Sequence, residues 1–141
     1  MRPIMLYSAV MLSAAAAALP ATAATTKFEI SLRGAAEVPG PGAPNGAGEA
    51  SLTFDTDKAQ VCYMLHAMGT DAPTMAHIHK GAAGVAGGVV VPLTAPTNGM
   101  SEGCAAVSAD IIAAILAAPA GYYVNVHTAA FPAGALRGQL K

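Results

Sequence analysis

The sequence contains little charge and few aromatic residues. Of its 141 residues, 11% are charged and 5% are aromatic, and tryptophan is absent. Seven lysines and arginines stand against eight aspartates and glutamates, so there is little positive charge to neutralise phosphates. Nucleic-acid binding is therefore disfavoured. A hydrophobic content of 54% argues against disorder, and the length suits a single domain.

The N-terminus has the pattern of a cleavable export signal. A basic start at Arg2 is followed by the apolar, alanine-rich segment 4–19 and by small residues at 21–23 in the spacing of a signal-peptidase site. A membrane span would need about 20 continuous apolar residues, and polar residues follow too soon. The sequence therefore predicts a signal peptide over 1–23, one domain over 24–141 without a membrane span, and a periplasmic or secreted protein.

Cysteine is scarce, with Cys62 and Cys104 as the two examples. In an oxidising compartment two cysteines are more often joined than free. Neither has the C-x-x-C spacing of a thiolate metal site, so metal ligation is the less favoured alternative. The sequence predicts a structural disulfide, which the chain-entropy model values at about 4 kcal/mol.

Beyond the signal, apolar residues mostly recur with a period of two. In the segment 27–33, Phe28, Ile30 and Leu32 alternate with polar residues, which is typical of a strand with one buried face. The proline-rich and glycine-rich stretch 37–46 predicts a loop. Further strands are expected at 51–55, 61–66, 74–79, 89–93, 121–127 and 135–140.

One short helix interrupts the strands. Ser108 can cap its first turn, Asp110 lies near its positive end, and Pro119 ends it. The strands show no βαβ alternation. The sequence therefore predicts an all-β protein, an antiparallel Greek-key sandwich or barrel of about seven strands with one short helix.

Three of the four histidines fall in two of the expected strands. His77 and His79 are two residues apart, so their side chains leave the strand on one face, and His127 lies in the strand 121–127. If these strands are neighbours, three neutral imidazoles can bind a cation such as copper or zinc and leave a position open. The alternative is that the histidines are polar surface residues or tie loops down, because H-x-H is a short motif.

Five separate motifs carry a family resemblance. They are Glu37-Val38-Pro39, Ala76 to His79, Gly84 to Leu93, Tyr123 to Thr128 and Arg137 to Leu140. Together they resemble the CHRD domain, a family named from its repeats in chordin and common in exported bacterial proteins. The resemblance covers the chain from about Phe28 to Leu140. It implies an extracytoplasmic all-β domain, and it supports the fold more than any activity.

A weaker likeness is to the copper-zinc superoxide dismutases, which are Greek-key β proteins. In those enzymes an H-x-H strand and a later histidine hold copper, and a late arginine guides the anion. By position, His77, His79 and His127 resemble the copper ligands and Arg137 the guiding arginine. No histidine lies between His79 and His127, so the likeness implies a single-metal version without the zinc subsite.

The surroundings of such a site are left open by the sequence. The fourth ligand is His66, Glu37, a tyrosine or water, although His66 shares a face with Met64 that we expect to be buried. Arg137 either attracts a substrate anion or pairs at a strand edge with Glu37 or Asp110. Of Tyr122 and Tyr123, one can face the side of His127.

Methionine gives a further, ambiguous signal. Thioethers are soft ligands that suit Cu(I), but scattered methionine more often fills gaps in a core, and we expect that role here. The methionines concerned are Met64, Met68, Met75 and Met100.

Two functions are consistent with these patterns. The first is an exported protein that binds one metal ion through three histidines and acts as a superoxide dismutase on a small anion. Copper is the first choice, with manganese, iron or zinc as alternatives. The second is a non-enzymatic extracytoplasmic binding or adhesion module, in which 37–39 and the loop 81–88 frame a recognition surface and the histidines are structural. The sequence does not specify the oligomeric state.

Overall fold

The computed structural model describes residues 24–141, and most strands form where polar and apolar residues alternate. The expected signal peptide over 1–23 lies outside the described residues. The strands are β1 (Thr25–Arg33), β2 (Ala47–Asp55), β3 (Gln60–Met68), β4 (Pro73–Lys80), β5 (Val89–Leu93), β6 (Met100–Ala106), β7 (Tyr122–Thr128) and β8 (Leu136–Gln139). The helices are η1 (Gly34–Ala36), α1 (Ala109–Ala117) and η2 (Pro119–Gly121).

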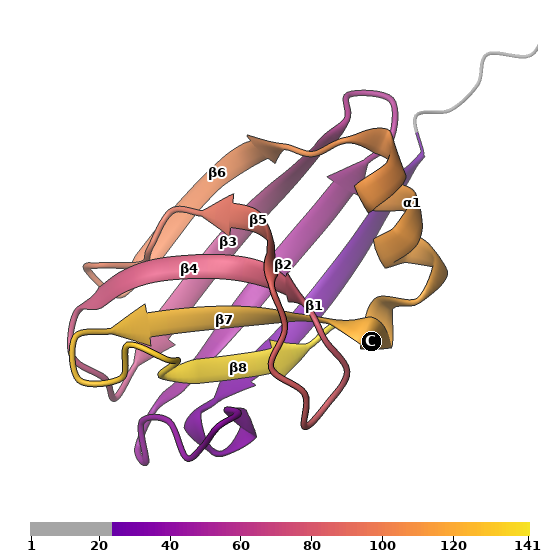
Figure 1. Ribbon diagram of the computed structural model, residues 1–141. Helices are drawn as coiled ribbons and strands as arrows, with labels where there is room; N and C mark the ends of the chain where they lie inside the picture. Colours follow the sequence, from indigo (N-terminus) through magenta and orange to yellow (C-terminus); the bar gives the residue numbers. More distant parts are fainter. Residues whose placement is uncertain (1–23) are drawn as a thin grey trace, which may run out of the picture.

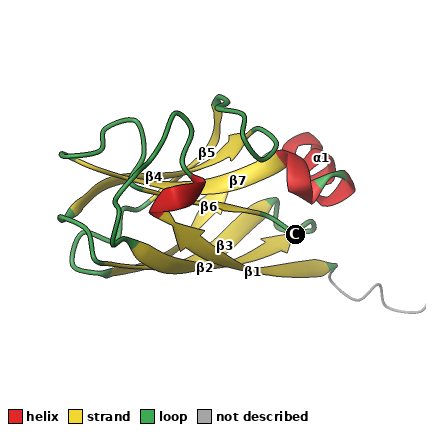
Figure 2. Ribbon diagram, turned by 90° about the horizontal axis from the view of Figure 1, so that it is seen from below, coloured by secondary structure: helices red, strands yellow, loops and turns green. Residues whose placement is uncertain are grey.

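All strand pairings are antiparallel, in the order β5-β4-β7-β8-β1-β2-β3-β6. The two edge strands, β5 and β6, approach each other, so the sheet nearly closes into a barrel. Figure 2 shows it flattened into two layers, with β1, β2 and β3 facing β4, β5 and β7. The predicted all-β class is confirmed.

The core lies between these layers, where the inward side chains of both meet. Strand alternation places Leu52 and Leu65 inside one layer and Ile78, Val124 and Val126 inside the other, all of them fully buried. The polar residues that alternate with them therefore lie on the outer faces. For this reason the histidines of β4 and β7 cannot point into the barrel.

The predicted helix is present as α1 at one end of the barrel (Figure 1). The Ser108 hydroxyl accepts the backbone N–H of Ile111 at 3.4 Å, as expected for an N-cap. Ile112 and Ile115 are fully buried against the core, which anchors the helix. No helix among residues 24–141 is long and apolar enough to span a membrane.

An eighth strand, β6, was not predicted from the sequence. Its seven residues include Gly103 and no β-branched residue, and none of them is buried, so no alternation of apolar residues marks it. The strand is held by its pairing with β3, where Cys62 lies directly opposite Cys104. These two residues form the predicted disulfide. In this way the cysteines tie an edge strand to the sheet.

Candidate metal centre

The two strands that carry the three histidines are neighbours in the sheet. In the β4–β7 pair, His77 lies opposite Asn125, His79 opposite Tyr123, and Met75 opposite His127. All three imidazoles are on the outer face of this pair, and one nitrogen from each lies within 4.8 Å of the others. The predicted cluster of His77, His79 and His127 is therefore present, and it could hold a metal ion.

The distances within the cluster suit a shared cation. The ring centroid of His77 is 5.4 Å from that of His79 and 5.1 Å from that of His127. His77 Nδ1 is 3.2 Å from His127 Nε2. Two nitrogens bound tetrahedrally at about 2.0–2.1 Å from a zinc ion lie about 3.4 Å apart. Small side-chain movements would thus convert this contact into a pair of metal bonds.

Backbone carbonyls orient two of the rings. His79 Nδ1 is 2.9 Å from the carbonyl oxygen of Gly87, and His127 Nδ1 is 2.9 Å from that of Pro132. Because a carbonyl can only accept, Nδ1 carries the proton in both rings and Nε2 is left with its lone pair. This is how the histidine ligands of metal sites are usually held.

Glycine makes the contact to His79 possible. A Cβ atom on Gly87 would lie 1.6 Å from the carbonyl oxygen of Lys80, so a larger residue does not fit this turn. The backbone N–H of Gly87 also donates to the Tyr123 hydroxyl at 3.1 Å. The loop 81–88 is therefore folded against the site, with the carbonyl group of Gly87 turned toward His79.

Burial prepares the histidines to bind a cation. The side chains of His79 and His127 are buried, and His77 is half-buried at the solvent side. Burial lowers the pKa of His77, and the neighbouring His127 and His79 lower it further. Burial also lowers the pKa of His79, and Arg137 and His127 act in the same direction, against the bond to Gly87. Both rings are thus neutral near pH 7, which is the form that binds metal.

One buried nitrogen of the cluster has no hydrogen-bond partner. His79 Nε2 is fully buried and unpaired among residues 24–141. Leaving a buried polar group unsatisfied costs about 1–3 kcal/mol. A metal ion held between the three rings would satisfy this nitrogen, so the donor set fits such an ion.

Arg137 reaches the site through an aromatic ring. Its guanidinium carbon lies 3.5 Å from the centroid of the Tyr123 ring, and this ring stacks on His79 with centroids 4.8 Å apart and planes 7° apart. Since β4 and β8 flank β7 on opposite sides, the Tyr123 ring lies between His79 and Arg137. As expected, one tyrosine faces the site, while Tyr122 belongs to the core.

The alternative expectation for Arg137, an ion pair at a strand edge, was wrong. Arg137 is 2% exposed and forms no ion pair with Glu37 or Asp110. Its guanidinium instead donates to the carbonyl oxygens of Ala82 and Val85, at 2.8 and 2.9 Å, and to the side chain of Gln139. These bonds fasten the loop 81–88 over the site.

Glu37 lies beside the cluster. Its carboxylate is buried and accepts the side-chain amide of Asn125, which also donates to the Leu136 carbonyl oxygen at 3.3 Å. Burial raises the pKa of Glu37 to about 7, although Arg137 and the backbone N–H of Val38 act in the opposite direction. Glu37 does not belong to the group that could hold the ion.

The structure narrows the choice of a fourth ligand. His66 is on the outer face of β3, in the opposite layer, so the hypothesis that it is the fourth ligand was wrong. The expectation that His66 and Met64 share a buried face was also wrong, because Met64 is 49% exposed. The Tyr123 hydroxyl is engaged with Gly87. Water remains available. Met75, one of the scattered methionines noted from the sequence, is exposed on β4 opposite His127.

Comparison with protein-family models gives a match to the CHRD domain over residues 28–140. The matched span contains the three histidines, Arg137 and the disulfide. Comparison with curated proteins and with solved structures gives no match.

Proposed function

Since the chain belongs to the CHRD domain family, we propose that it is an exported protein that binds one metal ion through His77, His79 and His127. The observation that carries this proposal is the buried, unpaired Nε2 of His79 in a group of three rings that each offer one nitrogen within 4.8 Å of the others. Buried polar atoms in folded proteins nearly always have a partner, and a cation between the rings would supply one for this lone pair. The Cys62–Cys104 disulfide supports export to an oxidising compartment.

Copper is the metal we favour. Three neutral imidazoles suit borderline cations, and copper binds such ligands more tightly than the other divalent metals of its series. Manganese, iron and zinc are the alternatives. When bound, copper would supply the one-electron redox chemistry that superoxide dismutation requires, and this is the activity we propose.

The residues around the cluster would serve a small anionic substrate. His77 is the half-buried member, so the site is reached from its side. Arg137 places a positive charge behind the Tyr123 ring, and this charge helps to lower the pKa of His79, which supports a role for its field at the cluster. The N–H groups of Arg137 are bound to loop carbonyls. We therefore propose that Arg137 attracts the anion through its electric field and does not contact it directly.

The rival function, a binding module with structural histidines, is less well supported. It needs Glu37 as part of a recognition surface, and Glu37 is buried against Asn125. It also leaves the unpaired nitrogen of His79 unexplained.

Metal content tests the proposal. Protein purified without an affinity tag and loaded with Zn(II) should hold one ion at this site, and His77→Ala and His127→Ala should each lose it. His66→Ala is the matched control, because it removes an imidazole from the opposite layer and should keep the ion. Full zinc content in His77→Ala or His127→Ala would refute the proposed site.

Activity is tested separately on the copper-loaded protein. We expect consumption of superoxide that falls as salt is added, because screening weakens the attraction of the anion. The activity should disappear in His127→Ala. A copper-loaded protein without activity would restrict the function to metal binding.

A further inference from the structure

The methionines do not fill the core. Each of the four methionines in residues 24–141 is exposed, so the expected core-filling role was wrong. Leucine, isoleucine and valine occupy the interior instead. The exposed fractions are 49% for Met64, 53% for Met68, 47% for Met75 and 61% for Met100. A single exposed apolar side chain is common on a protein surface, so the grouping of these side chains, more than their exposure, calls for a reason.

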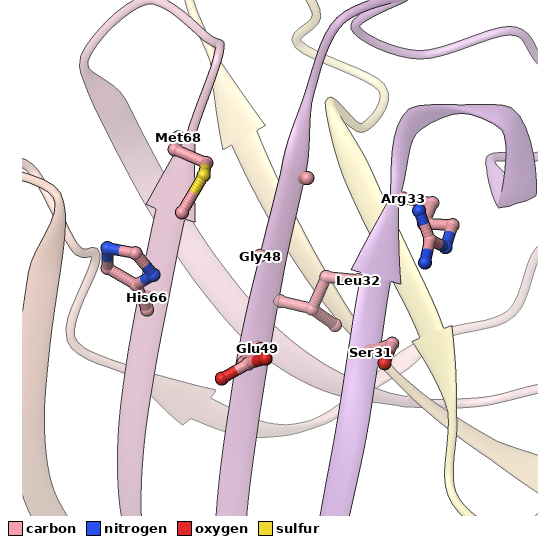
Figure 3. Close-up of a pocket in the computed structure, with 8 residues that line it drawn as sticks. Ser31, Leu32, Arg33, Gly48, Glu49, His66 and Met68 are labelled. Atoms are coloured by element: carbon pink, nitrogen blue, oxygen red, sulfur yellow. The ribbon is translucent and has the colours of Figure 1, made fainter.

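Three of these methionines surround the remaining histidine. Met64, His66 and Met68 alternate along the outer face of β3, and Met100 of β6 lies directly opposite His66. Figure 3 shows His66 and Met68 together on β3, with Glu49 on the neighbouring strand. We call the four residues Met64, His66, Met68 and Met100 the thioether cluster.

We propose that the thioether cluster is a second metal site, which binds a soft monovalent cation of the Cu(I) type. Thioether sulfur and imidazole nitrogen are ligands that Cu(I) accepts at low coordination number, whereas Zn(II) and other harder ions bind thioethers poorly. The ligand set thus differs in kind from the three imidazoles of the first site.

The strand geometry allows the four side chains to converge. Side chains two residues apart on one strand are separated by about 7 Å, and directly opposite Cβ atoms on neighbouring strands by about 5 Å. His66 and Met100 form such an opposite pair, and Met64 and Met68 flank it. Methionine has three rotatable bonds, so a sulfur on either side can turn toward the imidazole.

Charge around the cluster favours a cation. Glu49 lies opposite His66 on β2, and Glu102 lies opposite Met64 on β6. Both carboxylates are exposed, and neither belongs to an ion pair within residues 24–141. Met64, Met100 and Glu102 line one hollow of this face. Glu49, His66 and Met68 line another, whose far side is formed by β1 with Arg33. An apolar docking patch would not need a histidine opposite one unpaired acid and a second unpaired acid opposite Met64.

The cluster is independent of the first site. β3 and β4 belong to opposite layers of the flattened barrel, and the outer faces of these layers point away from each other (Figure 2). The disulfide partner Cys62 shares the outer face of β3, but its sulfur is bonded to Cys104. Within residues 24–141, the thioether cluster therefore consists of the side chains on this face that offer a thioether sulfur or an imidazole nitrogen and are free to bind a metal.

A competition titration tests the site. The zinc-loaded full chain, with its disulfide intact, is titrated anaerobically with Cu(I) against a chromophoric Cu(I) chelator. We expect one Cu(I) per chain in addition to the zinc, and about a tenfold or larger loss of affinity in the Met64→Leu/Met68→Leu/Met100→Leu variant. Met75→Leu is the control and should bind as the wild type does. Circular dichroism checks that each variant is folded.

A second measurement identifies which methionine side chains bind Cu(I). With methyl-labelled methionine, Cu(I) should shift the NMR signals of Met64, Met68 and Met100 in the zinc-loaded protein and leave that of Met75 in place. Equal Cu(I) affinity in the triple leucine variant would overturn the proposal, as would unshifted signals. Reduced self-association without a change in Cu(I) affinity would also overturn it and would identify a contact surface. If the first site takes no zinc, the same comparison is made in the His77→Ala/His127→Ala background, which removes the first site as a competing ligand set.

Discussion

At the scale of single residues, Glu37 is unusual because it is an acid buried without an ion-pair partner within residues 24–141. Its carboxylate accepts from Asn125, whose strand position lies between those of Tyr123 and His127. Burial raises its pKa to about 7. The folded protein therefore binds a proton at Glu37 under conditions in which the unfolded chain has released it.

This difference predicts how stability depends on pH. The pKa of Glu37 rises from 4.5 in the unfolded chain to about 7 in the folded protein. Its contribution to the free energy of unfolding is thus fully present below pH 4.5 and is lost as the pH rises through about 7. In Glu37→Gln this loss should be absent. Urea unfolding of both proteins without metal, across this range, measures the difference. Parallel pH profiles would contradict the assigned burial.

Arg137 gives a second prediction at this scale. Replacing it with Met removes the donors to the carbonyl oxygens of Ala82 and Val85 and leaves these acceptors near the core. We expect the free energy of unfolding to fall by about 3 kcal/mol. Arg33→Met is the matched control, since Arg33 is exposed and lies opposite Arg137 on β1, and it should change stability by about 0.5 kcal/mol or less.

Hydrogen exchange locates the effect of Arg137. The amide of Gly87 should lose protection in Arg137→Met, because the loop 81–88 is no longer fastened. Unchanged protection at Gly87 together with wild-type stability would show that Arg137 does not hold the loop.

At the scale of elements, the edge strand β6 depends on a covalent link. The disulfide joins it to β3 across residues 42 apart in sequence. Cys62→Ser/Cys104→Ser should therefore lower the free energy of unfolding by about 2–4 kcal/mol. Denaturant unfolding of the variant and of the wild type measures this. If the two proteins are equally stable, the disulfide has no structural role.

Strand parity explains how much of the fold could be predicted. In β4 and β7, apolar residues such as Ile78 and Val124 alternate strictly with the site residues, so the sequence alone placed His77, His79 and His127 on one face. In β6 no such alternation exists, and the strand was missed. In β3 both faces carry apolar side chains, so the sequence did not reveal that Met64 and His66 face outward.

The contacts that complete the candidate metal centre could not be predicted from the sequence. The carbonyl groups of Gly87 and Pro132 come from loops, and carbonyls are common to all residues, so no residue type marks them. The stack of His79, Tyr123 and Arg137 depends on β8 lying next to β7, which is a property of sheet order. Pairings between distant strands have no local signal.

At the scale of the whole molecule, the flattened barrel separates two ligand sets of different chemistry. Imidazoles gather on the outer face of β4 and β7, and thioethers gather on the outer face of β3 and β6. The apolar core between them makes the two faces structurally independent. Substitutions on one face should therefore leave metal binding on the other unchanged.

Anomalous X-ray diffraction at the copper edge, recorded from crystals of the copper-loaded protein, tests the first of these sites most directly. We predict a strong peak bonded to nitrogens of His77, His79 and His127 at about 2.0–2.1 Å, with the carbonyls of Gly87 and Pro132 still bound to the far side of their rings. Absence of a peak between these rings, with His77 still hydrogen-bonded to His127, would contradict the proposed metal centre.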